Sequence, residues 1–112
     1  MGLTEARARA NAEVVVAKIG FDSTTRTIID GRTFGFCKLI VDCKTAQILG
    51  CHVVGERAVE ITQVAAVCMA AQMRVNDVAK VPLSFPTYAG VLGRVAAQAS
   101  HALKLKLSWK AN

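Results

Sequence analysis

The sequence of 112 residues lacks the motifs that mark most common enzyme sites. It has no G-x-G-x-x-G and no phosphate-binding loop, so a nucleotide has no visible cradle. Its two histidines, His52 and His101, are far apart and have no Ser or Asp motif at the spacing of a catalytic triad. His52 falls on an expected strand, where a hydrogen-bonded structural histidine is the commoner outcome. The chain by itself is therefore not expected to be an enzyme.

The cysteines show no metal-binding or redox pattern. Cys37, Cys43, Cys51 and Cys68 form no C-x-x-C pair, and their spacings match no common zinc site. Free cysteine is one of the most often buried residue types. We expect four reduced residues in the core or on strands, and no metal site.

Long apolar runs are also missing. No stretch of about 18 uncharged apolar residues occurs that could cross a membrane. The first 13 residues are polar and helical in character, unlike a signal peptide with its apolar middle. These features predict a cytoplasmic protein with no membrane partner.

The composition is that of one folded domain covering residues 1–112. Apolar residues make up 53% of the chain and charged residues 20%, which excludes a disordered segment. A chain of this length buries roughly 65% of its unfolded surface and needs no metal or disulfide to hold a core. The apolar share is slightly above the ordinary range, so part of the surface is expected to meet a partner.

The net charge of +6 raises the alternative of a small nucleic-acid-binding domain. The distribution of the charge argues against it. Arg7 and Arg9 lie near one end of the chain, and Lys104, Lys106 and Lys110 lie near the other. No basic cluster is interleaved with aromatic residues, as a stacking platform for bases requires.

The first third of the chain predicts a short helix and a strand. Thr4 can cap a helix that runs through Ala10, and the β-branched run Val14–Phe21 is typical of a strand buried on both faces or at an interface. Residues 22–27 are rich in turn formers, and Ile28–Gly31 is expected to be a brief apolar step into an Asp-Gly turn.

The middle of the chain predicts a β-hairpin. Phe34–Asp42 and Ala46–Val54 have strand patterns, and the short connection Cys43–Thr45 allows only an antiparallel pairing. Side chains alternate along a strand, so the first strand has one core face and one wetter face marked by Lys38 and Asp42. The expected core face carries Cys37, Leu39, Val41 and Cys43.

Two long helices are expected after the hairpin. Glu56–Met73 is apolar nearly all round, so either part of it meets another chain or it is an Ala-rich helix with tolerable exposure. The second helix runs from Thr87 to Lys104, with Pro86 at its start. Its small residues permit either a close approach by another backbone or packing on the domain's own sheet. The tail from residue 104 onwards continues this helix or frays.

Several motifs, in their order and spacing, resemble the C-terminal dimerisation domain of the FAD-dependent pyridine nucleotide-disulphide oxidoreductases. That family includes dihydrolipoamide dehydrogenase, glutathione reductase, mercuric reductase and soluble transhydrogenase. Residues 2–6, GLTEA, are similar to the V-G-x-T-E segment that opens this domain. Residues 49–55, LGCHVVG, are similar to the family's I-L-G-x-H-x-x-G, and Glu60 falls where the following helix usually carries a glutamate. The resemblance implies an α+β fold, an antiparallel sheet flanked by helices, and a two-fold dimer.

The resemblance also shows what this chain lacks. In the disulphide-reducing members the last helix begins H-P-T-x-x-E, and the His and Glu form an acid-base pair that reaches the partner's active site. Here Phe85 stands at the His position and Gly90 at the Glu position, and neither can move or orient a proton. The nearest parent activity would resemble that of mercuric reductase or soluble transhydrogenase. In the family the residue before Pro86 approaches the flavin across the dimer, and that peptide is often cis.

The leading hypothesis is a homodimerisation module that is not catalytic alone and carries no cofactor of its own. The main alternative is a fragment of an FAD- and NAD(P)-dependent oxidoreductase that is active only with its missing domains. In such a parent, the backbone of Phe85 and Pro86 is the expected cofactor contact. The expected interface residues are Val59, Gln63, Val67, Phe85, Thr87, Tyr88, Leu92 and Val95.

Overall fold

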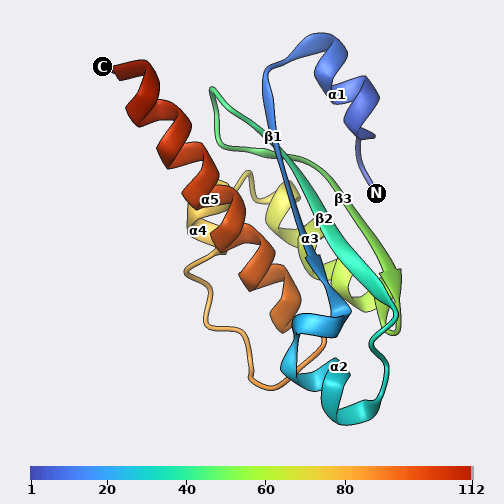
Figure 1. The fold of residues 1–112 in the computed structure, drawn as a ribbon. Helices are drawn as coiled ribbons and strands as arrows, with labels where there is room; N and C mark the ends of the chain where they lie inside the picture. The colour runs from blue at the N-terminus through green and yellow to red at the C-terminus, as the bar shows by residue number, and fades with distance from the viewer. Residues whose placement is uncertain (112) are drawn as a thin grey trace.

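The computed structural model describes residues 1–111, with side chains as far as Lys104. The fold is α+β: a three-stranded antiparallel sheet in the order β1-β2-β3, with helices on both of its faces (Figure 1). The elements in chain order are α1 Glu5–Asn11, β1 Val14–Gly20, the 3-10 turn η1 Phe21–Ser23, α2 Thr25–Asp30, β2 Gly35–Asp42, β3 Ile48–Gly55, α3 Ala58–Ala70, α4 Val75–Val78 and α5 Gly90–Ala111.

The predicted hairpin is confirmed as β2 and β3. Their register pairs Leu39 with Cys51, and an irregularity follows at Ile40. Asp42 holds the connecting turn, because its Oδ1 accepts hydrogen bonds from the backbone N–H of Lys44 at 2.7 Å and of Thr45 at 3.3 Å. These two hydrogen bonds to backbone amides of the turn stabilise the short connection.

The main core lies between one face of the sheet and helices α3, α4 and α5 (Figure 1). The predicted core face of β2 is confirmed, since all four of its side chains are buried. On the helical side, Ile61 and Ala65 of α3 and Leu92 and Val95 of α5 complete the packing. The four cysteines are unpaired and buried, as expected. The hydrogen bond between Cys37 and Cys51, followed by burial, raises the pKa of Cys37, so that residue stays a neutral thiol.

The opposite face of the sheet is covered in part by α1. Thr4 caps this helix as predicted, with its Oγ1 accepting from the N–H of Arg7. Glu5 forms an ion pair with Lys38 at 2.9 Å, which ties the helix to β2. Ala8 packs with Val14 and Ile40 in a small second core, so Ile40 is fully buried although its strand neighbour Lys38 is half exposed.

The segment before α1 runs along β3. Leu3 N–H donates to the Leu49 carbonyl at 2.9 Å, and Gly2 bridges to Gly50. A Cβ at Gly50 would lie 2.2 Å from the Leu3 carbonyl oxygen, so this close approach requires glycine. His52 Nε2 donates to the Leu3 carbonyl at 2.9 Å, which confirms a structural histidine.

Residues 25–30 form a helix, which corrects the expectation of a turn at Ile28–Gly31. The buried Thr27 hydroxyl bonds to the Phe21 carbonyl, and Arg26 pairs with Asp30 at 3.2 Å, four residues on. Gly31 ends the helix in the left-handed conformation, with φ 70°. The threonine side chains thus stabilise a short helix here instead of a loop. The Asp30–Gly31 pair, expected to be a turn, is the C-terminal end of this helix.

The long helices differ from prediction mainly at their ends. The helix expected over Glu56–Met73 is shorter, as α3, and the one expected from Thr87 begins three residues later, as α5. The helix continues through the tail to Ala111. Within the described part of the chain, each helix is too short or too polar to span a lipid bilayer.

Candidate functional site

The loop between α4 and α5 carries the Phe85–Pro86 segment. The peptide between these residues is cis, as the family resemblance implies. Phe85 is 78% exposed, so its ring is offered to solvent instead of packing in the core. Thr87 fixes the start of α5, since its Oγ1 donates to the Ser84 carbonyl at 2.6 Å and accepts from Gly90 N–H at 3.1 Å. The segment is therefore an exposed aromatic side chain on a well-anchored turn.

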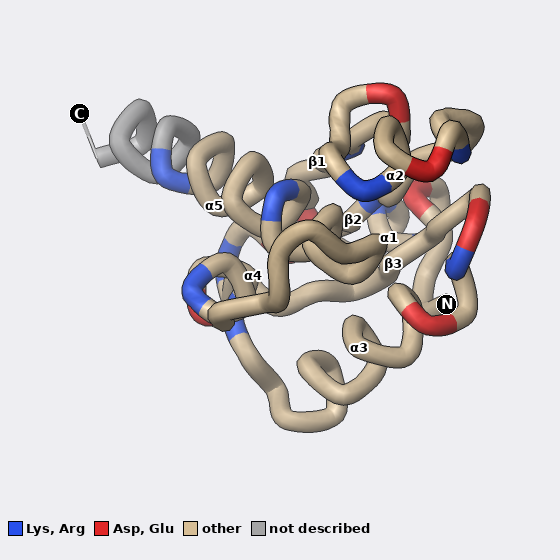
Figure 2. Tube along the Cα trace, turned by 90° about the horizontal axis from the view of Figure 1, so that it is seen from below, with Lys and Arg blue, Asp and Glu red and all other residues tan. Residues whose placement is uncertain are grey.

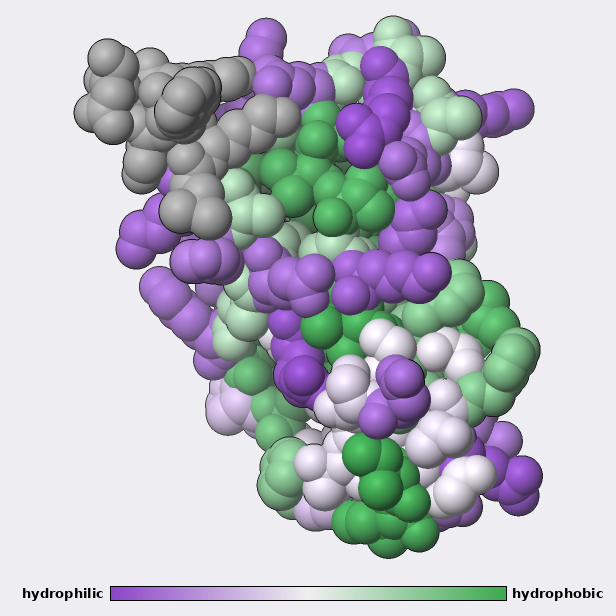
Figure 3. Space-filling model, viewed as in Figure 1, coloured by the Kyte–Doolittle hydropathy of each residue, from purple (hydrophilic) through white to green (hydrophobic). Residues whose placement is uncertain are grey.

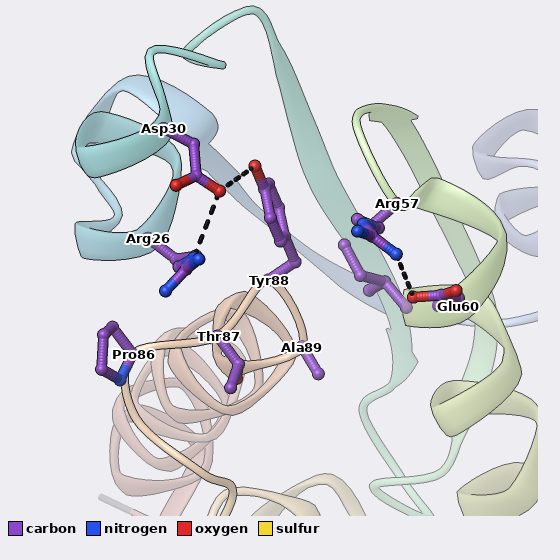
Figure 4. Close-up of a pocket in the computed structure, with 9 residues that line it drawn as sticks. Arg26, Asp30, Arg57, Glu60, Pro86, Thr87, Tyr88 and Ala89 are labelled. Atoms are coloured by element: carbon purple, nitrogen blue, oxygen red, sulfur yellow. Dashed lines mark hydrogen bonds and ion pairs between the residues drawn. The ribbon is translucent and has the colours of Figure 1, made fainter.

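A cavity of about 370 Å3 lies beside this segment, between α2, α3 and the loop that leads into α5 (Figure 4). Figure 4 shows the Tyr88 hydroxyl and the Arg26 guanidinium both directed at Asp30, with Oδ2 accepting from Tyr88 at 2.8 Å. The Tyr88 hydrogen bond is the main cause that holds the pKa of Asp30 below its usual range. Burial and Asp30 together raise the pKa of Tyr88.

The other wall of the cavity is the start of α3. Arg57, which has a left-handed backbone conformation, pairs with Glu60 at 3.6 Å. Glu60 is thus an exposed partner of Arg57, at the position where the resemblance expects a glutamate. Both arginines of the cavity are paired within the chain, so it offers no uncompensated charge to an ion.

The exposed side of α3 carries a row of side chains four residues apart, Val59, Gln63 and Val67, here called the α3 ridge. Val59 is 81% exposed and Val67 61% exposed, which are large values for β-branched apolar residues on a helix. Glu60 and Ile61, which follow Val59 on α3, line the cavity beside Tyr88 together with Pro86. An apolar helical stripe left uncovered by its own domain is typical of a contact with another surface.

Two of the predicted interface residues lie elsewhere. Leu92 and Val95 are 0% exposed and pack against the chain's own core, so they have no surface to offer a partner, and that prediction is wrong. Their side of α5 faces the sheet, which is the alternative that the sequence left open. Val59, Gln63, Val67 and Phe85 are exposed, while Thr87 and Tyr88 are half buried at the edge of the cavity.

Sequence reasoning missed Arg26, Asp30 and Arg57. The first two lie on α2, which was expected to be a turn, although their spacing of four residues is a helical pairing signal. Arg57 gives no local signal, because its role depends on the left-handed backbone at the start of α3.

Comparison with known proteins identifies the family. A profile described as "Pyridine nucleotide-disulphide oxidoreductase, dimerisation domain" matches residues 1–96. The chain belongs to this family. As a dimerisation domain of the pyridine nucleotide-disulphide oxidoreductases, it has the fold and the arrangement of motifs that the sequence predicted.

The relatives are much longer proteins. The chain is 31% identical over 90 residues to a mercuric reductase from Bacillus cereus, covering 80% of this chain and 14% of the relative. It is 31% identical over 97 residues to a dihydrolipoyl dehydrogenase from Synechocystis sp., covering 82% of this chain and 20% of the relative. The chain therefore spans about a fifth or less of the length of these relatives.

The fold is shared with solved structures of such enzymes. The HOCl-induced flavoprotein disulfide reductase RclA from Escherichia coli superposes with a TM-score of 0.82 at 24% identity, covering 86% of this chain and 22% of that one. LpdA from Mycobacterium tuberculosis gives a TM-score of 0.81 at 20% identity, covering 88% and 22%. These similarities establish the fold of the dimerisation domain. They do not assign a reaction to this chain.

Proposed function

We propose that this chain pairs with a second copy of itself through the α3 ridge and the Phe85–Pro86 segment. The observation that carries the proposal is the exposure of Val59, Val67 and Phe85 in a domain whose family is defined by dimerisation. From Val59 to Val67 the α3 ridge rises by eight steps of the helix, or about 12 Å, and can pack against the same helix of a partner. Such a contact is self-complementary, as a two-fold dimer requires.

A rival apolar surface lies at the end of the molecule formed by α2. Apolar side chains gather there in Figure 3, and Ile28 and Ile29 of α2 are 55% and 62% exposed. This patch sits on a helix of only six residues, whose Arg26 and Asp30 line the cavity beside Tyr88. The α3 ridge is the longer and more regular of the two surfaces, so we assign the dimer contact to it.

The test of this assignment compares two double variants. In Val59→Asp with Val67→Asp, two carboxylates would be buried in the interface without partners, so the dimer is expected to dissociate at least about a hundredfold more readily. The measurement is sedimentation equilibrium, with circular dichroism to show that the monomer remains folded.

The matched control is Ile28→Asp with Ile29→Asp, which places the same two charges on the rival surface. This variant is expected to dimerise like the unmodified chain. The assignment fails if the α2 variant dissociates while the α3 variant does not.

The same contact suggests a role within a larger enzyme. We propose that, in an FAD- and NAD(P)-dependent oxidoreductase, this domain joins two subunits and presents the backbone of Phe85 and Pro86 to the flavin edge of the partner. In the part of the chain that the structure describes, the arginines of the cavity beside Tyr88 are paired with carboxylates, so this cavity offers no free cation to the phosphates of a flavin cofactor. The cofactor would be held by other domains, and this chain supplies shape and exclusion of water at Phe85.

Phe85 and Gly90 also bear on the reaction class. Because neither side chain exchanges a proton, we propose that any parent enzyme works without the His-Glu acid-base pair of the disulphide-reducing members. Gly90 N–H is used to cap α5, and Phe85 lies exposed at its start. The reaction of such a parent enzyme would not use proton transfer by a side chain at Phe85 or Gly90.

A further inference from the structure

Another cavity, with three basic side chains on its wall, lies away from the Phe85–Pro86 segment. Its volume is about 430 Å3, within the range of small-molecule sites. It is formed where α4, α5 and the turn between β2 and β3 meet. Ser100 on its wall lies ten residues beyond Gly90, or about 15 Å along α5. The lining residues are Ala46, Arg74, Asn76, Lys80, Ser100, Leu103 and Lys104.

The charge of this cavity has one sign. Arg74, Lys80 and Lys104 line it, and no carboxylate does. Among the residues that the structure describes, none of these three side chains forms an ion pair or hydrogen bond. Arg26, Lys38 and Arg57, in contrast, all have carboxylate partners. Figure 2 shows basic positions near α4 and along α5. The acidic residue of α4 is Asp77, which does not line the cavity.

The backbone around the cavity is fixed. Val75 N–H donates to the Ala46 carbonyl at 2.8 Å, and Gln47 bridges to Arg74, so the turn of the hairpin is held against the start of α4. Leu103 is buried and gives the cavity an apolar floor. Asn76 and Ser100 are half buried and supply neutral hydrogen-bonding groups beside the charges.

These groups have the chemistry of a phosphate site. A guanidinium forms two parallel hydrogen bonds to phosphate oxygens, and ammonium groups add point charges. All three side chains are exposed, and an anion between them would lower the repulsion of like charges around one hollow. We propose that Arg74, Lys80 and Lys104 bind a small phosphorylated molecule in the cavity between α4 and α5. The cavity fits a small ligand better than a nucleic acid, whose long backbone would need the basic residues spread along a continuous track.

Inorganic pyrophosphate is the probe that tests this proposal. NMR titration of the unmodified chain is expected to show saturable amide shifts confined to residues 74–80 and 100–104. In Lys80→Gln with Lys104→Gln, affinity for pyrophosphate is expected to fall about tenfold or more, because two charge-assisted contacts are lost. A parallel titration with ADP tells whether a nucleoside extends into the cavity or the phosphates alone are bound.

The control variant is Arg7→Gln with Arg32→Gln, which removes the same net charge from exposed positions outside the cavity. Its affinity is expected to stay within about threefold of the unmodified chain, since remote surface charges are screened by salt. Equal losses in both variants would show non-specific attraction and overturn the proposal, as would the absence of saturable pyrophosphate binding. Tighter binding of a single-stranded oligonucleotide, with shifts spread over the surface, would also contradict it.

Discussion

The hydrogen bond between Tyr88 and Asp30 links the loop before α5 to α2 across the cavity. It is the largest cause of the lowered pKa of Asp30. A carboxylate whose pKa is lower in the folded state contributes stability above its unfolded pKa and loses it as pH falls through the folded value. The link therefore favours the folded protein at neutral pH and weakens in acid.

Tyr88→Phe tests this link. The variant removes the donor, so the pKa of Asp30 is expected to rise towards the ordinary aspartate range, and the loss of stability in acid becomes less steep. NMR titration of the side-chain carboxyl carbons gives the pKa, and denaturant unfolding across acidic pH gives the slope. An unchanged pKa of Asp30 in the variant would show that the hydrogen bond does not hold the carboxylate.

Individual residues were predictable where their role is local. Thr4 as a helix cap and Asp42 on the wetter side of its strand follow from neighbours a few residues away. Leu92 and Val95 were misassigned because apolar residues on a helix predict burial without telling which surface buries them. Only the packing of α5 on β1 and β2 decides that.

At the scale of the elements, α5 begins with a glycine that the backbone does not require. A Cβ at Gly90 would lie 3.6 Å from Thr87 Oγ1 and 4.0 Å from the Ser84 carbonyl oxygen, which is ordinary contact. Gly90→Ala is therefore expected to stabilise the chain by about 0.5–1 kcal/mol, because alanine favours helix and restricts the unfolded chain. Thermal unfolding measures the change.

Gly50→Ala is the informative counterpart. The added Cβ would meet the Leu3 carbonyl oxygen at 2.2 Å and separate the N-terminal segment from β3, so this variant is expected to lose stability. If Gly90→Ala were destabilised to the same degree, the described start of α5 would be wrong.

The elements differ in how well the sequence predicts them. The hairpin of β2 and β3 was predicted because alternation and a short turn leave one possible pairing. Helix α2 was not predicted, because most of its six residues are β-branched threonines and isoleucines, which have low helix propensity. Its stability comes from the buried hydroxyl of Thr27 and from the cap at Gly31, and the first of these is a tertiary feature.

At the scale of the whole molecule, the chain is a dimerisation domain and the flavin is expected to belong to other domains. Gel filtration of the chain mixed with FAD is therefore expected to give a protein peak without the visible absorbance of flavin. Free FAD run alone is the control. A yellow protein peak would mean that this domain holds the cofactor itself and would contradict the proposed division of roles.

The main features that the sequence predicted at this scale were the fold class and the surplus of apolar surface. The exposed valines of α3 make up part of that surplus. The other side of α3 is also apolar because it packs in the core, which explains why the helix is apolar on nearly all sides. The choice between the α3 ridge and the α2 patch lay beyond the sequence, because it needed the exposure of each side chain.

The molar mass of the unmodified chain, measured by sedimentation velocity across micromolar concentrations, shows whether the domain pairs with itself. We expect a species of twice the 11.9 kDa chain mass that dissociates on dilution. A single species of 11.9 kDa at every concentration would contradict it.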